Sequence, residues 1–265
     1  MAAKKKFNKA STSPGGKAPT ARQKLIRDFL GRVETGDLAG VTKALQDLPG
    51  LAHAVRKLDS SGLLVECTGL HLAATKGHLD VVKALVNAGA RVDAEDFVEQ
   101  TPLMNAAMFC HAPVVEYLLQ QGANPNHAAS EGYTALMYAA RNSSVASMDL
   151  LLAKGARINQ ATEAGDTALF FAIHTDPEDR DVVKFLLHRG IDAEAKNSDG
   201  MTAAGLAREE GKQDLATFIE DYAEQLEVDQ EHQKHLAKQK DIDVIRHGID
   251  HPITVKKPLQ FKTSL

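Results

Sequence analysis

The chain has 265 residues, 43% of them hydrophobic and 25% charged, which allows a sizeable core and is typical of a soluble globular protein. It has two cysteines, no apolar run near the roughly 20 residues that span a bilayer, and no apolar stretch after its basic N-terminus. This composition argues against a disulfide framework, a membrane span and Sec export. It favours a reducing, cytoplasmic location, with the nucleus or a host-cell cytosol left open.

Residues 1–24 are predicted to be a disordered basic arm, because they combine Lys, Ser, Pro and Gly with little apolar surface to bury. The stretch 1–27 carries a charge of +8 and contains no acid, so a formal total of −4 leaves −12 for the rest of the chain. Residues 4–27 are therefore either a solvated tail or an arm that binds nucleic acid or another polyanion. The acidic body offers no basic face to continue such a contact, which favours the solvated tail.

The next segment predicts a helix with an apolar stripe: Leu25, Ile26, Phe29, Leu30 and Val33. The following "TGDLAGVTKAL" resembles the start of a second helix. The interval from Gly50 to Thr68 is longer by six positions than the equivalent interval from Gly89 to Thr101. The first turn is therefore enlarged.

A regular period governs the middle of the chain. The segment "TGLHLAATKGH" begins at Thr68, and similar segments begin at Thr101, Thr134 and Thr167, with a weaker copy at Thr202. The successive starts are spaced by 33, 33, 33 and 35. The glycines that close the units are spaced by 33, 33 and 35: Gly89, Gly122, Gly155 and Gly190. Two independent landmarks with one period predict a solenoid of repeated units.

Each unit is predicted to contain two short antiparallel helices and an extended turn. The threonines are suitable N-caps for the first helix, and small residues such as Ala106 and Ala107 allow close helix packing. The second helix carries an apolar stripe, as in Val81, Val82, Leu85 and Val86. One unit is too small to bury its own stripe, so neighbouring units must stack.

These units resemble the ankyrin repeat, whose pattern T-P-L-H-x-A-A…G-H…V-V…L-L…G-A is closest in "TGLHLAATKGHLDVVKALVNAGARVDAED". The resemblance covers about residues 25–220. It implies an all-α solenoid of about six repeats, with degenerate first and last repeats as caps, and a role in binding other proteins. In the family a histidine helps to hydrogen-bond the turns. Only His71 occupies that position here; the other repeats have Met104, Met137, Phe170 and Gly205.

Four bulky apolar residues of the unit 95–127 have no evident place in its core. With Leu103 at zero and 100° per helical residue, Met108 lies at about 140° and Phe109 at about 240°, away from the core stripe. The resemblance implies that this side faces the concave groove, together with the turn residues before each threonine. The candidate partner-binding residues are Leu64, Val65, Phe97, Val98, Gln100, Met108, Phe109, Tyr133, Arg141, Asn142, Asp166 and His174.

The candidate residues grade from apolar in the N-terminal repeats to polar or acidic in the C-terminal ones. Contiguous exposed apolar surface usually marks a binding site. One interpretation is a patch that binds another protein, whose identity the sequence does not give. The alternative is internal burial, with the enlarged first turn or a tail folded over the patch.

Residues 221–265 are predicted to form a charged helix and an extended C-terminal tail, "PITVKKPLQFKTSL". The tail is solvated, binds a partner, or lies in the groove of its own domain as a self-cap. Its final "TSL" resembles a class I PDZ ligand. Two pairs of histidines have the spacing of one helical face: His232 with His235, and His247 with His251. No cysteine lies nearby to complete a zinc site, so we expect no bound metal.

No enzyme signature is present. The chain lacks a P-loop, a G-x-G-x-x-G fingerprint, an H-E-x-x-H helix and a G-x-S-x-G elbow. Cys67 and Cys110 each have a nearby histidine, but neither pair has a known catalytic spacing, and structural positions explain both cysteines. We therefore predict a monomeric, non-enzymatic protein-interaction module that needs no cofactor.

Overall fold

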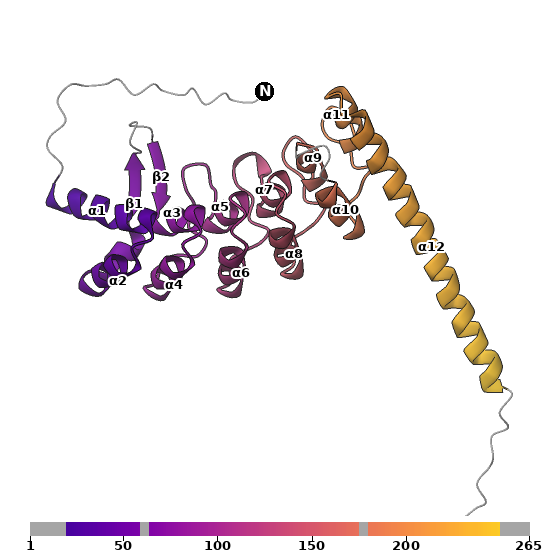
Figure 1. The fold of residues 1–265 in the computed structure, drawn as a ribbon, viewed down its shortest axis with the longest axis horizontal. Helices are drawn as coiled ribbons and strands as arrows, with labels where there is room; N and C mark the ends of the chain where they lie inside the picture. Colours follow the sequence, from indigo (N-terminus) through magenta and orange to yellow (C-terminus); the bar gives the residue numbers. More distant parts are fainter. Residues whose placement is uncertain (1–19, 59–63, 175–179, 250–265) are drawn as a thin grey trace, which may run out of the picture.

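The computed structural model describes residues 20–58, 64–174 and 180–249; the side chains at 56–58, 64–66 and 238–249 are outside this description. Over these ranges, twelve α-helices pair into six consecutive units, and the units stack side by side (Figure 1). The first helices form one layer and the second helices the other. This arrangement confirms the predicted all-α solenoid and its six units.

The first four units are α1 (Ala21–Thr35) with α2 (Leu38–Asp47), α3 (Gly69–Lys76) with α4 (Leu79–Asn87), α5 (Pro102–Met108) with α6 (Ala112–Gln120), and α7 (Ala135–Arg141) with α8 (Val145–Ala153). The last two are α9 (Ala168–Ala172) with α10 (Asp181–His188), and α11 (Ala203–Glu209) with α12 (Gln213–Ile249). Short 3-10 helices cover Pro49–His53 and Ser130–Gly132, and the strands are β1 (Val55–Leu58) and β2 (Leu64–Thr68).

One hydrophobic core runs between the two helix layers through all six units. Each inner repeat contributes the leucine two residues after its threonine, and all four are buried: Leu70, Leu103, Leu136 and Leu169. In the last unit Ala204 takes this position, and the exposed Glu209 and Glu210 follow at the helix end. The array therefore ends on a smaller apolar contact and a polar surface, as a terminal repeat requires.

The enlarged first turn forms a β-hairpin in which β1 pairs antiparallel with β2, from Val55 opposite Thr68 to Leu58 opposite Leu64. The six extra residues predict an enlarged turn here, but they do not predict a hairpin. Leu64 and Val65, two of the candidate binding residues, lie on β2, and their side chains are outside the described part.

The two ends of the array differ in position from the expected boundaries at residues 25 and 221. Helix α1 begins at Ala21, because Thr20 and Gln23 form a capping box ahead of the apolar stripe. Helix α12 runs without interruption from Gln213 to Ile249, since residues 221–240 contain good helix formers and neither Gly nor Pro. Its first turns pack against α10 and α11, and the rest leaves the stack (Figure 1).

The threonines that precede the first helices differ in whether their hydroxyl caps the helix. The hydroxyl of Thr101 accepts a hydrogen bond from the backbone N–H of Met104 at 3.4 Å, and Thr134 and Thr202 make the equivalent contact. Thr167 is also buried, yet its hydroxyl has no hydrogen-bond partner among the described residues. A buried hydroxyl without a partner loses its hydrogen bonds to water on folding and forms none in the folded protein, which costs free energy.

This difference gives a matched pair of substitutions. Thr101→Val should lower the free energy of unfolding by about 1 kcal/mol, because it removes a working N-cap. Thr167→Val should change it by less than about 0.5 kcal/mol or raise it, because no bond is lost. Urea unfolding measured by circular dichroism compares the two. Equal losses would contradict the assignment and imply a partner for the Thr167 hydroxyl.

Candidate binding surface

The turns between units are joined to one another by backbone hydrogen bonds. At each junction a backbone N–H of one turn donates to a carbonyl of the preceding turn: Ser130 to Val98 (3.1 Å), Glu163 to Glu131 (2.9 Å) and Ser198 to Ala164 (2.8 Å). These contacts fix the spacing of the turn tips, which project from the same side of the array as the β-hairpin (Figure 1). The tips therefore form a continuous and rigid edge.

His71 anchors the turn of the next unit. Its Nε2 lies 3.0 Å from the carbonyl oxygen of Gln100, and its Nδ1 lies 3.2 Å from the backbone nitrogen of Thr68. The N–H of Thr68 donates to Nδ1, so the neutral ring must carry its proton on Nε2 and donate it to Gln100. Within the same turn, the Asp96 carboxylate accepts from the backbone N–H groups of Val98 (3.0 Å) and Gln100 (2.9 Å).

Phe97 and Phe109 are the largest candidate residues that remain accessible, with 51% and 49% of their surface exposed. Phe97 lies at a turn tip, and Phe109 is the C-cap residue of α5. Val98 and Met108 are half-buried. Both phenylalanines therefore lie outside the core, on backbone that the neighbouring contacts hold in place.

Gln100 and Tyr133 belong to a packed row of side chains. The amide Nε2 of Gln100 donates to the Tyr138 hydroxyl at 2.6 Å, and burial raises the pKa of that hydroxyl. The Tyr133 ring stacks on Tyr138, with 5.7 Å between centroids, and packs at an angle against Phe171 at 5.4 Å. These contacts hold Gln100 and Tyr133 within the framework of the surface.

Tyr138 and Phe171 also belong to this row, although neither is among the candidate residues predicted from the sequence. Both lie four residues after the threonine of their repeat, where the preceding repeat has Asn105. On the helical rotation used for Met108 this position lies at about 200°, opposite the core stripe. The same angular rule, applied to every repeat, would have identified this row.

Of the remaining candidates, three are exposed and one is half-buried and hydrogen-bonded to the next turn. Arg141 and Asn142 are exposed at the end of α7, and the Asn142 carbonyl accepts from the Cys110 thiol at 3.2 Å. His174 is exposed, with its Nδ1 3.4 Å from a carboxylate oxygen of Glu210. Asp166 is half-buried and accepts from the side-chain amide of Asn197 at 3.1 Å. Asp166 thus links two turns, whereas the other three stay accessible.

Acidic residues occupy the turn tips. The turns 96–100, 129–133, 162–166 and 197–201 contain no Lys or Arg. Four exposed carboxylates in these turns make no ion pair within the described part of the chain: Glu99, Glu131, Glu163 and Asp199. We use the name inner surface for Phe97, Phe109, Arg141, Asn142 and His174 together with these four acidic tips.

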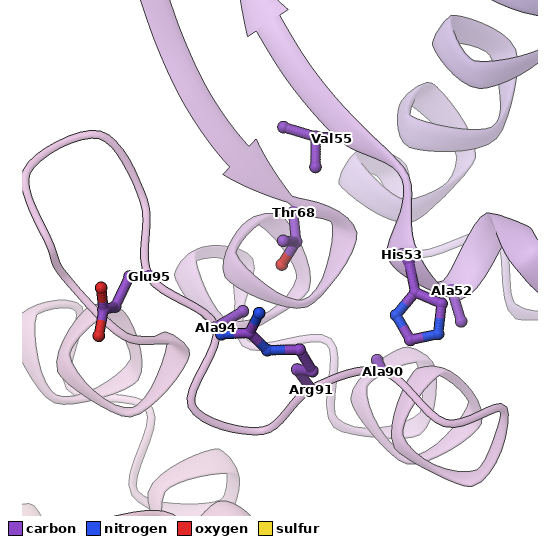
Figure 2. A pocket seen from close by; sticks show the side chains of 8 residues that line it. All are labelled: Ala52, His53, Val55, Thr68, Ala90, Arg91, Ala94 and Glu95. Atoms are coloured by element: carbon purple, nitrogen blue, oxygen red, sulfur yellow. The ribbon is translucent and has the colours of Figure 1, made fainter.

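A pocket of about 380 Å³ lies beside the base of the hairpin (Figure 2). Its ionisable side chains come from separate segments: His53 follows α2, while Arg91 and Glu95 lie in the turn after α4. Glu95 lies 3.7 Å from His127 of the next unit, so it is not directed at His53 or Arg91. The described residues contain no cluster of His, Cys, Asp and Glu that could hold a metal ion, and none of their helices has the length and apolarity of a membrane crossing.

Comparison with known proteins agrees with the repeat architecture. A family model described as ankyrin repeats in three copies matches residues 38–129, 70–162 and 122–197, which together exceed half of the chain. The chain belongs to the ankyrin-repeat family. Ankyrin repeats typically bind proteins and are typically non-catalytic.

This ankyrin-repeat protein also shares 40% identity over 87 residues with the serine/threonine-protein kinase VIK of Arabidopsis thaliana. The match covers 33% of this chain and only 18% of that kinase. The chain thus resembles a small part of the kinase, and a match of this extent does not show kinase activity here.

The buried His71 makes the stability of the array depend on pH. Burial lowers the pKa of the His71 imidazole, against the opposing effects of the Gln100 carbonyl and the Asp96 carboxylate. A lowered folded-state pKa means that protons bind more readily to the unfolded chain. The contribution of His71 to the free energy of unfolding is therefore fully present above the unfolded pKa of about 6.5. This contribution is lost as the pH falls towards the folded-state pKa.

We expect His71 to contribute up to about 1.4 kcal/mol per pH unit to this fall, the slope for one proton. His71→Met, which copies Met104 of the next repeat, should remove that contribution. The measurement is urea unfolding at several pH values between 7 and 5 for wild type, His71→Met and a control, His53→Gln, at an exposed position. An unchanged pH dependence in His71→Met would show that His71 is not the responsible group.

Proposed function

We propose that this ankyrin-repeat protein binds another protein through its inner surface and acts as a non-enzymatic adaptor or scaffold in the cytoplasm. The observation that carries this proposal is the exposure of Phe97 and Phe109 on an otherwise well-packed framework. Other large apolar residues of the nearby repeats are buried in the core, for example Leu103, Leu118 and Leu136. Two half-exposed rings on rigid backbone fit the pattern of anchor residues at an interface.

The two exposed rings would supply part of the binding free energy. Covering the exposed half of each phenylalanine would contribute about 1 kcal/mol per ring, since full burial of such a side chain is worth about 1.5–3 kcal/mol. The hydrogen bonds between turns reduce the conformational entropy that a partner must offset on binding. The two anchors together supply about 2 kcal/mol of the roughly 8 kcal/mol that micromolar binding requires, so other contacts along the inner surface would have to supply the rest.

Charged residues of the inner surface would orient the partner. Arg141 and His174 lie at the ends of first helices, whereas the acidic tips lie at the turns. A partner with the opposite arrangement of charge would be favoured in one orientation and disfavoured in the reverse.

The test is affinity capture from the source lysate with wild type and a Phe97→Asp/Phe109→Asp variant. We expect a protein retained by wild type to bind the variant at least about tenfold more weakly, because two anchors would be replaced by carboxylates. The matched control is Leu48→Asp, since Leu48 is also 49% exposed but lies at the end of α2 in the second-helix layer.

Circular dichroism must first show that all three proteins are folded, and gel filtration at a concentration low enough for wild type to be monomeric must show that they are equal in size. Isothermal titration with the identified partner then measures each affinity. Equal binding by wild type and the Phe97→Asp/Phe109→Asp variant would exclude the inner surface as the interface. Unfolding of that variant would instead assign the two phenylalanines to the core.

A further inference from the structure

The acidic tips of the inner surface recur once per unit, which limits what can bind along them. Backbone hydrogen bonds hold successive turns together, and packed helices lie about 8–10 Å apart, so tips two units apart are separated by about 20 Å. Glu99 and Glu163 form one such pair, and Glu131 and Asp199 form the other. A ligand that follows this edge would place positive charges at the same separation and an apolar side chain against Phe97.

The C-terminal segment of the chain has this chemistry. In "HPITVKKPLQFKTSL", residues 251–265, there are three lysines and no Asp or Glu. Pro252 and Pro258 disfavour a helix, and an extended chain advances about 3.3 Å per residue, so Lys256 and Lys262 would lie about 20 Å apart. Five large apolar side chains accompany them: Ile253, Val255, Leu259, Phe261 and Leu265.

Helix α12 decides whether this segment reaches the surface of its own chain. Leu226 is the last apolar residue of α12 that packs against the core, among the side chains described. The helix continues to Ile249, about 35 Å further at about 1.5 Å per residue, and it points away from the side on which the turns project (Figure 1). The tail therefore begins far from the turns.

Phe97 lies three units back along the stack, a further distance of about 25–30 Å. Even if the helix left the stack at a right angle, its end would be about 45 Å from Phe97, and its direction away from the turns increases this separation. The stretch from Ile249 to Phe261 spans at most about 40 Å when fully extended. The apolar part of the tail therefore does not reach Phe97 of its own chain while α12 stays intact.

We propose that residues 250–265 of one chain bind the inner surface of a second copy, so that the protein associates with itself through its tail. This inference rests on the proposed function because it uses the same surface. The lysines pair with acidic tips, and the apolar side chains of the tail cover Phe97 and Phe109. The same extended, apolar and basic chemistry defines the kind of foreign segment that would compete for the surface.

Mixing two defective full-length variants tests association between chains. The Phe97→Asp/Phe109→Asp variant keeps an intact tail, and Ile253→Asp/Phe261→Asp keeps an intact inner surface. We expect sedimentation to show that wild type associates with rising concentration and that each variant alone stays monomeric. Their mixture should form a one-to-one dimer, because it restores one complete contact.

A labelled synthetic peptide of residues 251–265 provides the second measurement. Fluorescence polarisation should show binding to full-length protein that is at least about tenfold weaker for Phe97→Asp/Phe109→Asp and unchanged for Leu48→Asp. Glu131→Lys/Glu163→Lys alters only exposed side chains and should weaken binding about fivefold at low salt. Raising the salt concentration should weaken wild-type binding, since exposed charges are screened.

Three results would overturn the inference: a monomeric wild type with no peptide binding, a mixture that stays monomeric, or association that persists in the inner-surface variant. Binding of a peptide of residues 4–27 in place of the tail peptide would assign the surface to the basic arm instead. None of these results bears on capture of a foreign partner by the inner surface. Failure of the tail contact and failure of the proposed function are therefore separable.

Discussion

The structure depends on one constraint: a pair of short helices cannot bury its own apolar stripe. Each unit has two stripes to cover, and among the described residues the neighbouring units supply the apolar surfaces that cover them. The hydrophobic contact between units is thus the main source of stability, and the regular period is its signature in the sequence. The same constraint explains why the ends must change in composition, as Ala204 and the polar residues after it do in the last unit.

Stacking also determines what the turns can do. Once the helices are fixed at one spacing, each turn lies close enough to the next for backbone hydrogen bonding, and His71 and Asp96 complete the polar contacts of the first such junction. A turn held in this way keeps its side chains in place without needing to bury them. Phe97 therefore remains half-exposed at a tip with little conformational freedom in its backbone. Rigid exposure of this kind follows from the repeat architecture and is what an interface needs.

The sequence was most informative where a period or a helical angle applied. The period predicted five units, and the apolar stripe that precedes them predicted a sixth. The helical angle of Phe109 predicted its exposure outside the core. The hairpin of the first turn was not predictable, because the inserted residues carry no periodic signal. Tyr138 was missed for another reason: the angular rule was applied to one repeat and not to its equivalents. The binding role of these residues is a proposal, since exposure alone does not name a partner.

The continuity of α12 shows how one local property changes the behaviour of the whole molecule. A stop signal near residue 221 would have left the following segment close to the array, where it could fold back over the inner surface. Without Gly or Pro there, helical propensity continues the helix past the last core contact at Leu226. The helix then acts as a spacer that separates a basic, apolar tail from an acidic, aromatic surface of the same chain. In the proposed self-association, complementary segments that are kept apart within one chain meet between two chains, and the length of the spacer favours this contact over one within the chain.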